Sequence, residues 1–256
     1  MKTMQNRNSD PRGKLIFALD VGEDLNEALS WVDRLSGHIG LFKIGKEAFT
    51  HFGPEIVHQV RQRGGNVFLD LKFHDIPNTV ARASEAATGL GVSMFNMHAS
   101  GGKKMMEEAV AATRSLSEKR GFPMPVILAV TILTSLNDQD LKEIGFRGTT
   151  REAVVGLARM AQDAGVPGVI ASPQDIDDLR AACGQDFLIV TPGIRGAGAA
   201  ADDQKRTLSP LEAVSLGADY LVVGRPIRLA ADPAAEADAI VGEIAQGMSS
   251  RMKTKL

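Results

Sequence analysis

Short apolar runs alternate with amphipathic segments along almost the whole chain, and this alternation limits the fold more than any other feature. The apolar runs have the composition of strands, and the apolar residues between them recur at helical spacing. We count eight such strand–helix units, with no linker between them. The predicted strands are 15–19, 40–44, 67–72, 92–97, 126–131, 168–170, 187–190 and 220–223. The predicted helices are 24–35, 54–63, 77–90, 103–114, a short one around Leu141, 151–164, 173–182, 209–217 and 234–245.

The number and order of these units predict the fold class. Eight strand–helix units in 256 residues are typical of a closed α/β barrel, the (β/α)8 or TIM barrel. The alternative is an open doubly wound sheet, which usually has a Gly-rich turn after its first strand. Here that strand is followed by Asp20-Val21-Gly22-Glu23. We therefore predict one barrel domain over residues 13–247, a disordered N-terminal tail over 1–12 and a C-terminal tail over 248–256.

The composition argues against several kinds of partner. Lys and Arg number 29 against 31 Asp and Glu, so no basic excess suggests binding to nucleic acid or to an anionic membrane. A single cysteine, Cys183, cannot form an internal disulfide, which suits a reducing compartment. Residues 1–12 lack the apolar core of a signal peptide, and the apolar runs are far shorter than the roughly 20 residues that span a bilayer. We expect a cytoplasmic protein without nucleic-acid or membrane partners.

Polar residues with chemical functions collect at the carboxyl ends of the predicted strands, where barrels of this type place their active sites. They are Asp20, Lys43, Asp70, Lys72, His98, Thr134, Arg195 and Arg225. Because side chains alternate along a strand, Asp70 and Lys72 are expected to point the same way. With Lys43 before them and Asp75 after them, they make a row of alternating charge, which favours the charged form of each member. Lys72 is thus expected to act as an acid or electrostatic stabiliser rather than as a Schiff-base nucleophile, although an ion cluster that only stabilises the barrel stays possible.

The ends of the last two strands predict a phosphate site. Pro192-Gly193-Ile194-Arg195 and Gly224-Arg225 each offer backbone amides and a guanidinium, whose fork binds two phosphate oxygens at once. Barrels often bind phosphate with the loops after strands seven and eight. The small residues 196–201 could close over the phosphate as a lid, with Gln204 on the far side. Either segment alone could also be an ordinary turn.

These motifs together resemble those of the orotidine 5′-monophosphate decarboxylase family of the bacterial type. The resemblance rests on Asp70-Leu71-Lys72-Phe73-His74-Asp75-Ile76-Pro77-Asn78-Thr79, Phe42-Lys43-Ile44-Gly45-Lys46-Glu47, Leu133-Thr134-Ser135 and Thr191-Pro192-Gly193-Ile194-Arg195, and it covers residues 18–226. It implies a carboxy-lyase that converts orotidine 5′-phosphate into uridine 5′-phosphate and CO2, the last step of de novo UMP (pyrimidine) biosynthesis. The family uses no metal and no cofactor, so neither is expected here.

The same resemblance assigns roles to residues. Asp70 would face the substrate carboxylate, and Lys72 would stabilise and protonate the carbanion left at C6. The other positions that match the family are Lys43 and Asp20 for the ribose and the charge row, Thr134 for the pyrimidine edge, and Arg195, Gln204, Gly224 and Arg225 for the phosphate. Asp75, Ile76 and Thr79 would reach into the active site of a neighbouring subunit, which implies a homodimer with shared active sites.

Two other functions stay open. Related barrel enzymes that act on sugar phosphates, such as 3-keto-gulonate 6-phosphate decarboxylase and hexulose-phosphate synthase, also carry Asp-x-Lys-x-x-Asp but need a divalent metal. The segment Ile76-Pro77-Asn78-Thr79 after the second aspartate favours the orotidine family. The third candidate is a non-catalytic sensor of a phosphorylated metabolite, but a sensor has no need of the charge row around Lys72.

Overall fold

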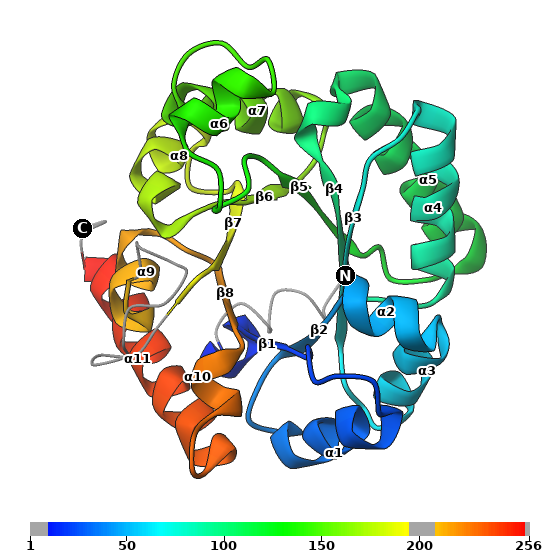
Figure 1. The fold of residues 1–256 in the computed structure, drawn as a ribbon, viewed down its shortest axis with the longest axis vertical. Helices are drawn as coiled ribbons and strands as arrows, with labels where there is room; N and C mark the ends of the chain where they lie inside the picture. The colour runs from blue at the N-terminus through cyan, green and yellow to red at the C-terminus, as the bar shows by residue number, and fades with distance from the viewer. Residues whose placement is uncertain (1–9, 195–207, 254–256) are drawn as a thin grey trace. The chain divides into compact units, whose positions relative to one another are not determined.

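The computed structural model describes residues 10–194 and 208–253. Its eight strands follow one another in the order of a closed barrel, β1 to β8, and every strand is followed by at least one helix (Figure 1). The (β/α)8 barrel predicted from the alternation is thereby confirmed. The strands are β1 (Leu15–Ala18), β2 (Leu41–Gly45), β3 (Val67–Phe73), β4 (Met94–His98), β5 (Val126–Val130), β6 (Gly168–Ile170), β7 (Leu188–Pro192) and β8 (Tyr220–Val223).

The chain divides into two compact units, one made of residues 1–70 and 191–256 and the other of residues 71–190. In the first unit β1 pairs in parallel with both β2 and β8, so that Ile16 lies opposite Leu41 and Val222. In the same unit β2 pairs with β3, and Gly45 lies opposite Asp70. These pairings align the carboxyl ends of the strands within the unit.

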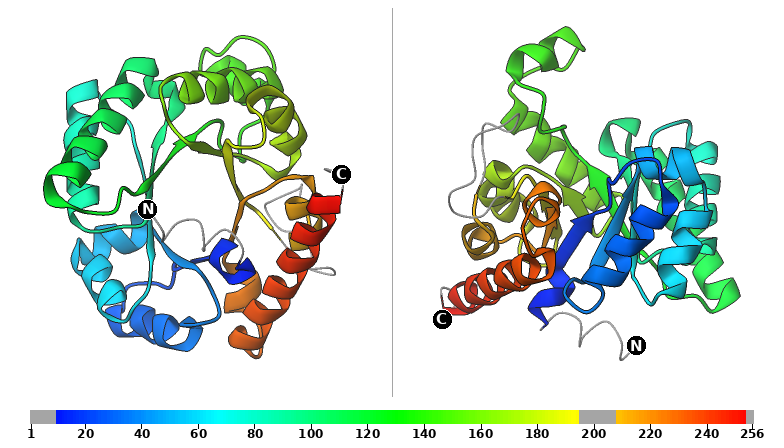
Figure 2. Two further views of the ribbon diagram at one scale, coloured as in Figure 1. Left: turned by 180° about the vertical axis from the view of Figure 1, so that it is seen from behind. Right: turned by 60° about the horizontal axis from the view of Figure 1, so that its bottom comes forward.

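Aromatic rings and a long terminal helix build the core of the first unit. Phe17 of β1 stacks on Trp31 at 5.6 Å between ring centroids and meets Phe42 edge-on at 6.5 Å. The last helix of the unit, drawn in red in Figure 2, packs against the helix that begins at Pro210. The helices of this unit are the 3₁₀ turn η2 (Pro11–Lys14), α1 (Leu25–Leu35), α2 (Lys46–Phe52), α3 (Glu55–Gln62), α9 (Pro210–Leu216), α10 (Arg225–Arg228) and α11 (Pro233–Lys253).

The second unit contains the parallel pairs β4–β5, β5–β6 and β6–β7. Met94, Phe95 and Met97 of β4 are almost completely buried, because both faces of a parallel strand are covered. The helices of this unit are α4 (Pro77–Gly89), η3 (Ala99–Gly101), α5 (Lys103–Arg120), α6 (Asp138–Glu143), α7 (Thr150–Asp163), η4 (Pro173–Asp175) and α8 (Ile176–Cys183). Of the helices described in either unit, none is long and apolar enough to cross a membrane.

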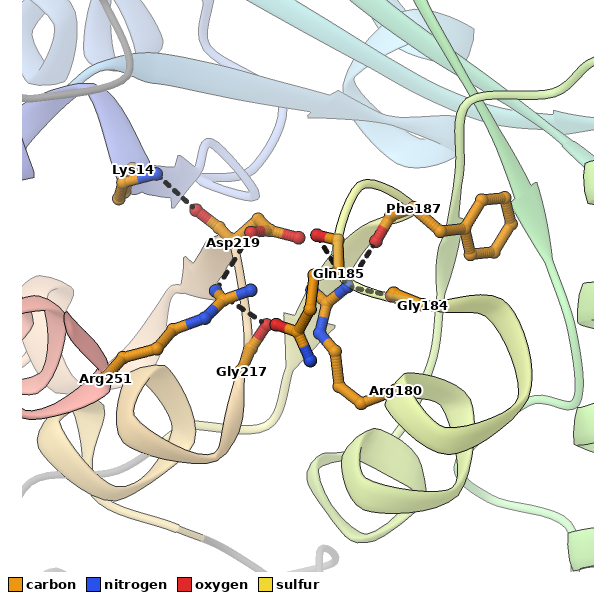
Figure 3. Close-up of polar contacts among 8 residues, drawn as sticks. All are labelled: Lys14, Arg180, Gly184, Gln185, Phe187, Gly217, Asp219 and Arg251. Atoms are coloured by element: carbon orange, nitrogen blue, oxygen red, sulfur yellow. Dashed lines mark hydrogen bonds and ion pairs between the residues drawn. The ribbon is translucent and has the colours of Figure 1, made fainter. Parts of the chain in front are cut away.

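Arg180 closes the turn between α8 and β7 in the second unit. Its Nη1 donates hydrogen bonds to the carbonyl oxygens of Gly184, Gln185 and Phe187, at 2.9, 3.3 and 2.6 Å (Figure 3). The side chain is buried, so these carbonyls satisfy a charge that has left water. Cys183, the last residue of α8, is also buried, and desolvation raises the pKa of its thiol. A buried thiol of this kind packs like a small apolar side chain.

The C-terminal helix is longer than the sequence predicted. It was expected to end near Ala245 but continues to Lys253. In its last turn Arg251 Nη1 donates to the carbonyl oxygen of Gly217 and to Asp219 Oδ1, both at 3.1 Å (Figure 3). This contact with a distant part of the sequence stabilises the last turn of α11, although the polar sequence of that turn does not by itself predict a helix.

Other differences concern short elements and helix ends. α2 and α10 were not predicted, and α5 runs past Arg114 to Arg120, where the left-handed Gly121 ends it.

At the N-terminus, residues 11–12 of the expected tail form the start of η2, and residues 1–9 lie outside the described part of the chain. The final residues 254–256 of the expected C-terminal tail lie outside it as well.

Candidate active site

Three of the predicted site residues come together in the first unit around the ammonium group of Lys43. Lys43 Nζ lies 3.3 Å from both carboxylate oxygens of Asp20 and 3.4 Å from Asp70 Oδ2. The side chains of Lys43 and Asp70 are 11% and 12% exposed, whereas that of Asp20 is 44% exposed. The cluster therefore runs from a half-exposed carboxylate through a nearly buried ammonium to a nearly buried carboxylate. Because water is largely excluded around the inner pair, its electrostatic interactions are stronger than on an open surface.

Gly45 makes room for this cluster. A Cβ atom at this position would lie 3.0 Å from Asp20 Oδ1 and 3.1 Å from Lys43 Nζ, closer than carbon normally approaches either group. The residue has no functional group, so the sequence did not mark it as part of the site. The available signal was a glycine at the end of a strand, which often indicates a close approach by other groups.

Lys72 lies near the end of β3, and its backbone has an unusual conformation. Its φ is +54°, the only positive φ at a non-glycine residue in the described part of the chain. Its N–H donates a hydrogen bond of 2.8 Å to Oδ1 of Asn96, a completely buried residue of β4. The regular alternation of a strand does not hold through a left-handed residue, so the direction of the Lys72 side chain depends on this local geometry.

The segment after Lys72 is exposed. Asp75 Oδ1 accepts the N–H of Ile76 at 2.6 Å, and Pro77 then begins α4. Asp75, Ile76 and Thr79 are all exposed, and Ile76 has 67% of its surface accessible although it is apolar. Thr134, which follows β5, is exposed as well.

His98, at the end of β4, has its ring 5.5 Å from the ring of His74. This ring contact is consistent with a structural role for His98.

The predicted phosphate residues are described only in part. Gly224 precedes α10, and a Cβ atom there would lie 3.2 Å from Cβ of Ala18. The adjacent Arg225 is exposed, and Arg228 of the same short helix donates to the backbone oxygen of Asp20 at 3.2 Å. Arg195, Gln204 and the small residues of the expected lid lie outside the described residues.

The comparison with known families decides where this chain belongs. Residues 13–240 match the family model described as "Orotidine 5'-phosphate decarboxylase / HUMPS family". The chain belongs to this family. The family assignment covers both compact units and therefore every described residue of the candidate site.

Individual members of the orotidine 5′-phosphate decarboxylase / HUMPS family are similar over nearly the full length. The orotidine 5′-phosphate decarboxylase of Syntrophus aciditrophicus is 61% identical over 251 residues, which are 98% of this chain and 99% of that protein. The protein of the same name from Geotalea daltonii is 54% identical over 238 residues, 93% of this chain and 98% of that one. The crystal structure of orotidine 5′-phosphate decarboxylase from Lactobacillus acidophilus superposes with a TM-score of 0.79 at 38% identity, and the match covers 90% of this chain and 97% of that one.

Within residues 10–194 and 208–253, no group of three or more His, Cys, Asp or Glu side chains is arranged so that it could hold a metal ion. The carboxylates of the site instead surround an ammonium group, Lys43.

Proposed function

We propose that this protein decarboxylates orotidine 5′-phosphate to uridine 5′-phosphate and CO2, the last step of de novo pyrimidine biosynthesis. The observation that carries the proposal is the Asp20–Lys43–Asp70 cluster, after which the chain continues directly to Lys72. The relatives support the choice of substrate, because proteins from 50% to 61% identical to this chain carry the name orotidine 5′-phosphate decarboxylase.

The chemistry requires a preorganised cation at the reacting carbon. Loss of CO2 leaves an electron pair on C6 of the pyrimidine, and no ring carbonyl is placed to accept it as an ordinary enolate. In the proposed mechanism the ammonium group of Lys72 stabilises this developing charge and then transfers a proton to C6, which forms the C–H bond of the product. Such a group accelerates the reaction because it interacts more strongly with the transition state than with the bound substrate.

Asp70 has a complementary role in this proposal. Its carboxylate faces the carboxylate of the substrate, and the repulsion decreases as that negative charge moves to C6. Lys43, at 3.4 Å from Asp70, holds this carboxylate in place and also contacts the ribose together with Asp20. Arg225 holds the phosphate together with Gly224, Arg195 and Gln204, while Thr134 contacts the pyrimidine edge. Phosphate binding then contributes energy that keeps the reacting groups in this arrangement.

The proposed assembly is a homodimer with shared active sites. Asp75, Ile76 and Thr79 lie on an exposed segment, and an apolar side chain as exposed as Ile76 suits a contact with a second copy of the chain. A twofold interface would bring this segment of each subunit to the site of the other.

The decisive assay follows the ultraviolet absorbance of orotidine 5′-phosphate in the presence of a chelator, since loss of the carboxylate changes the pyrimidine spectrum. The wild-type protein should be active, and Lys72→Ala should abolish turnover while the folded protein still binds UMP. Lys46→Ala, which removes an exposed lysine at the start of α2, is the matched control and should keep normal activity. Normal turnover by Lys72→Ala would exclude the acid role.

The same assay on the wild-type protein separates the alternative functions. Activity that disappears with chelator would favour a metal-dependent sugar-phosphate enzyme, and nucleotide binding without turnover would favour a sensor.

The phosphate role of Arg225 can be tested by comparing two substrates. Arg225→Ala should weaken phosphate-dependent binding by about 1.5–3 kcal/mol, the usual contribution of a hydrogen bond to a charged group. The slow turnover of a nucleoside substrate without phosphate should hardly change. Equal losses for both substrates would mean that Arg225 is structural.

The shared site can be tested with mixed dimers. Lys72→Ala and Asp75→Ala chains should each be inactive alone, but a mixed dimer should contain one site with both residues intact. Random mixing gives about half mixed dimers, so roughly a quarter of all sites should be active. If mixing is demonstrated and no activity returns, Asp75 serves the site of its own chain.

A further inference from the structure

We infer that Asn96 is a positioning residue for the reaction: its buried side-chain carbonyl holds the backbone of Lys72 in the left-handed conformation that directs the ammonium group. The inference rests on the proposed role of Lys72 as the acid. It concerns only residues of the second unit, in which both side chains are described.

The backbone of Lys72 needs an external constraint. At a φ of +54° the Cβ atom of an L-residue approaches the neighbouring carbonyl oxygen, so residues other than Gly, Asn and Asp seldom adopt this conformation. Such conformations persist where the surrounding structure fixes them, and they collect at functional sites. Lys72 is the one non-glycine residue of the described chain in this region of backbone space, and it is also the proposed acid.

Asn96 supplies a directional constraint at this point. Its side chain is completely buried in β4, and Oδ1 accepts the N–H of Lys72 at 2.8 Å. A hydrogen bond of this length is near the optimum for N–H and a carbonyl oxygen, and its strength depends on the direction of the N–H. This hydrogen bond thus fixes the orientation of the peptide group just before the Cα of Lys72.

The neighbouring contacts hold the same segment but are less specific. The rings of Phe73 and Phe95 are 5.9 Å apart, and those of His74 and His98 are 5.5 Å apart. These packing contacts keep the end of β3 beside β4, but rings can slide and tilt with little loss of contact. The hydrogen bond from Lys72 to Asn96 is therefore the interaction in this group that selects a backbone dihedral.

The expected consequence is a loss of rate with little change in nucleotide binding. The backbone of Lys72 is the point from which the ammonium group reaches C6, and an error of about 1 Å in the position of a catalytic group can cost on the order of 100-fold in rate. Asn96 contacts the peptide group and is not proposed to touch the substrate. Its loss should lower kcat and leave KM and the affinity for UMP almost unchanged.

The experiment compares variants that remove or keep the acceptor. Asn96→Leu and the smaller Asn96→Ala remove it, and each should lower kcat by about 100-fold. Asn96→Asp keeps an oxygen at the same place and should retain most of kcat. Phe95→Leu is the control for general packing damage, because it weakens the adjacent ring contact and leaves Asn96 in place. It should lower thermal stability with little effect on kcat.

A binding measurement separates positioning from structural damage. A UMP analogue with an anionic oxygen at C6 should bind close to the ammonium group of Lys72, so its affinity reports the position of that group. Calorimetry should show a loss of affinity for this analogue in Asn96→Leu and Asn96→Ala, while UMP binds as in the wild type. An unchanged kcat in folded Asn96→Leu or Asn96→Ala would overturn the inference. A kcat of Asn96→Asp no higher than that of Asn96→Ala would also overturn it, as would equal losses of affinity for UMP and for the anionic analogue. Inactive Lys72→Ala with fully active Asn96→Ala would refute only this inference. Normal turnover by Lys72→Ala would refute the acid role of Lys72, and a wild-type protein without turnover would refute the proposed function itself.

Discussion

Replacing Asp219 by Asn should destabilise the protein more than replacing its partner Arg251 by Met. Asp219 lies between two cations near the amino ends of β1 and β8. Arg251 Nη1 is 3.1 Å from Asp219 Oδ1, and Lys14 Nζ is 3.5 Å from the backbone oxygen of Asp219 (Figure 3). The side chains of Arg251 and Asp219 are only 19% and 14% exposed, so neither charge is fully hydrated.

The magnitudes follow from which charges remain in each variant. Arg251→Met keeps most of the apolar stem and loses hydrogen bonds to Asp219 and to the oxygen of Gly217, which should cost about 2–3 kcal/mol. The carboxylate of Asp219 then still has Lys14 nearby. Asp219→Asn instead leaves two largely buried cations without this carboxylate, and breaking a buried pair in this way costs about 3–5 kcal/mol.

The dependence on pH provides a second test. Burial lowers the pKa of Lys14 below its usual value, and the charge of Asp219 partly offsets this effect. Asp219→Asn should therefore lower the pKa of Lys14 further. Because the unfolded chain then binds more protons than the folded protein, stability should rise with pH between the folded and unfolded pKa values of Lys14. The destabilisation by Asp219→Asn should accordingly become smaller as the pH approaches 10.5.

Urea unfolding at one fixed protein concentration measures both effects, since association would make the stability depend on concentration. The free energy of unfolding should decrease in the order wild type, Arg251→Met, Asp219→Asn at pH 7.5. If Asp219→Asn loses no more than Arg251→Met, or if its loss is the same at pH 7.5 and pH 10, the cations do not depend on this carboxylate and the reasoning is refuted.

Two further predictions concern the charge cluster and a helix start. Gly45→Ala should push Asp20 and Lys43 apart by a few tenths of an ångström, because its Cβ would lie 3.0 and 3.1 Å from them. This should lower kcat/KM on the order of 3–10-fold in steady-state assays; unchanged kinetics would show that the cluster adjusts freely. Hydrogen bonds from Ser209 lower the pKa of Glu212 below its usual 4.5, so this stabilisation should be present above pH 4.5 and lost as the pH falls through the lowered pKa. Glu212→Gln should remove that part of the acid dependence of unfolding, and identical pH profiles of the two proteins would contradict it.

The arrangement of strands could be predicted because it depends on patterns within short stretches. The strands 168–170 and 220–223 agree residue for residue with the sequence prediction. Ser209 followed by Pro210 correctly marked the start of α9, where the Ser209 side chain accepts the N–H of Glu212 in a capping box. α2 follows β2 without any side-chain cap, and α10 has only four residues, so neither has a sequence signal strong enough to be recognised.

The site could be predicted only where chemical groups mark it. Asp20, Lys43 and Asp70 carry charges at strand ends, and the structure brings them together. The contact between Lys72 and Asn96 joins residues 24 positions apart, and no local pattern specifies which buried amide will meet which peptide group. The left-handed conformation of Lys72 was equally hidden, because lysine does not favour it.

That conformation also has an evolutionary consequence. A left-handed backbone at a residue other than glycine costs about 1–2 kcal/mol, so Lys72→Gly would relieve backbone strain while removing the proposed acid. Selection for folding and selection for activity thus act in opposite directions at this one position. In a lineage that obtains pyrimidines from its surroundings, position 72 would be among the first to drift, and the resulting protein would persist as a stable barrel without its reaction.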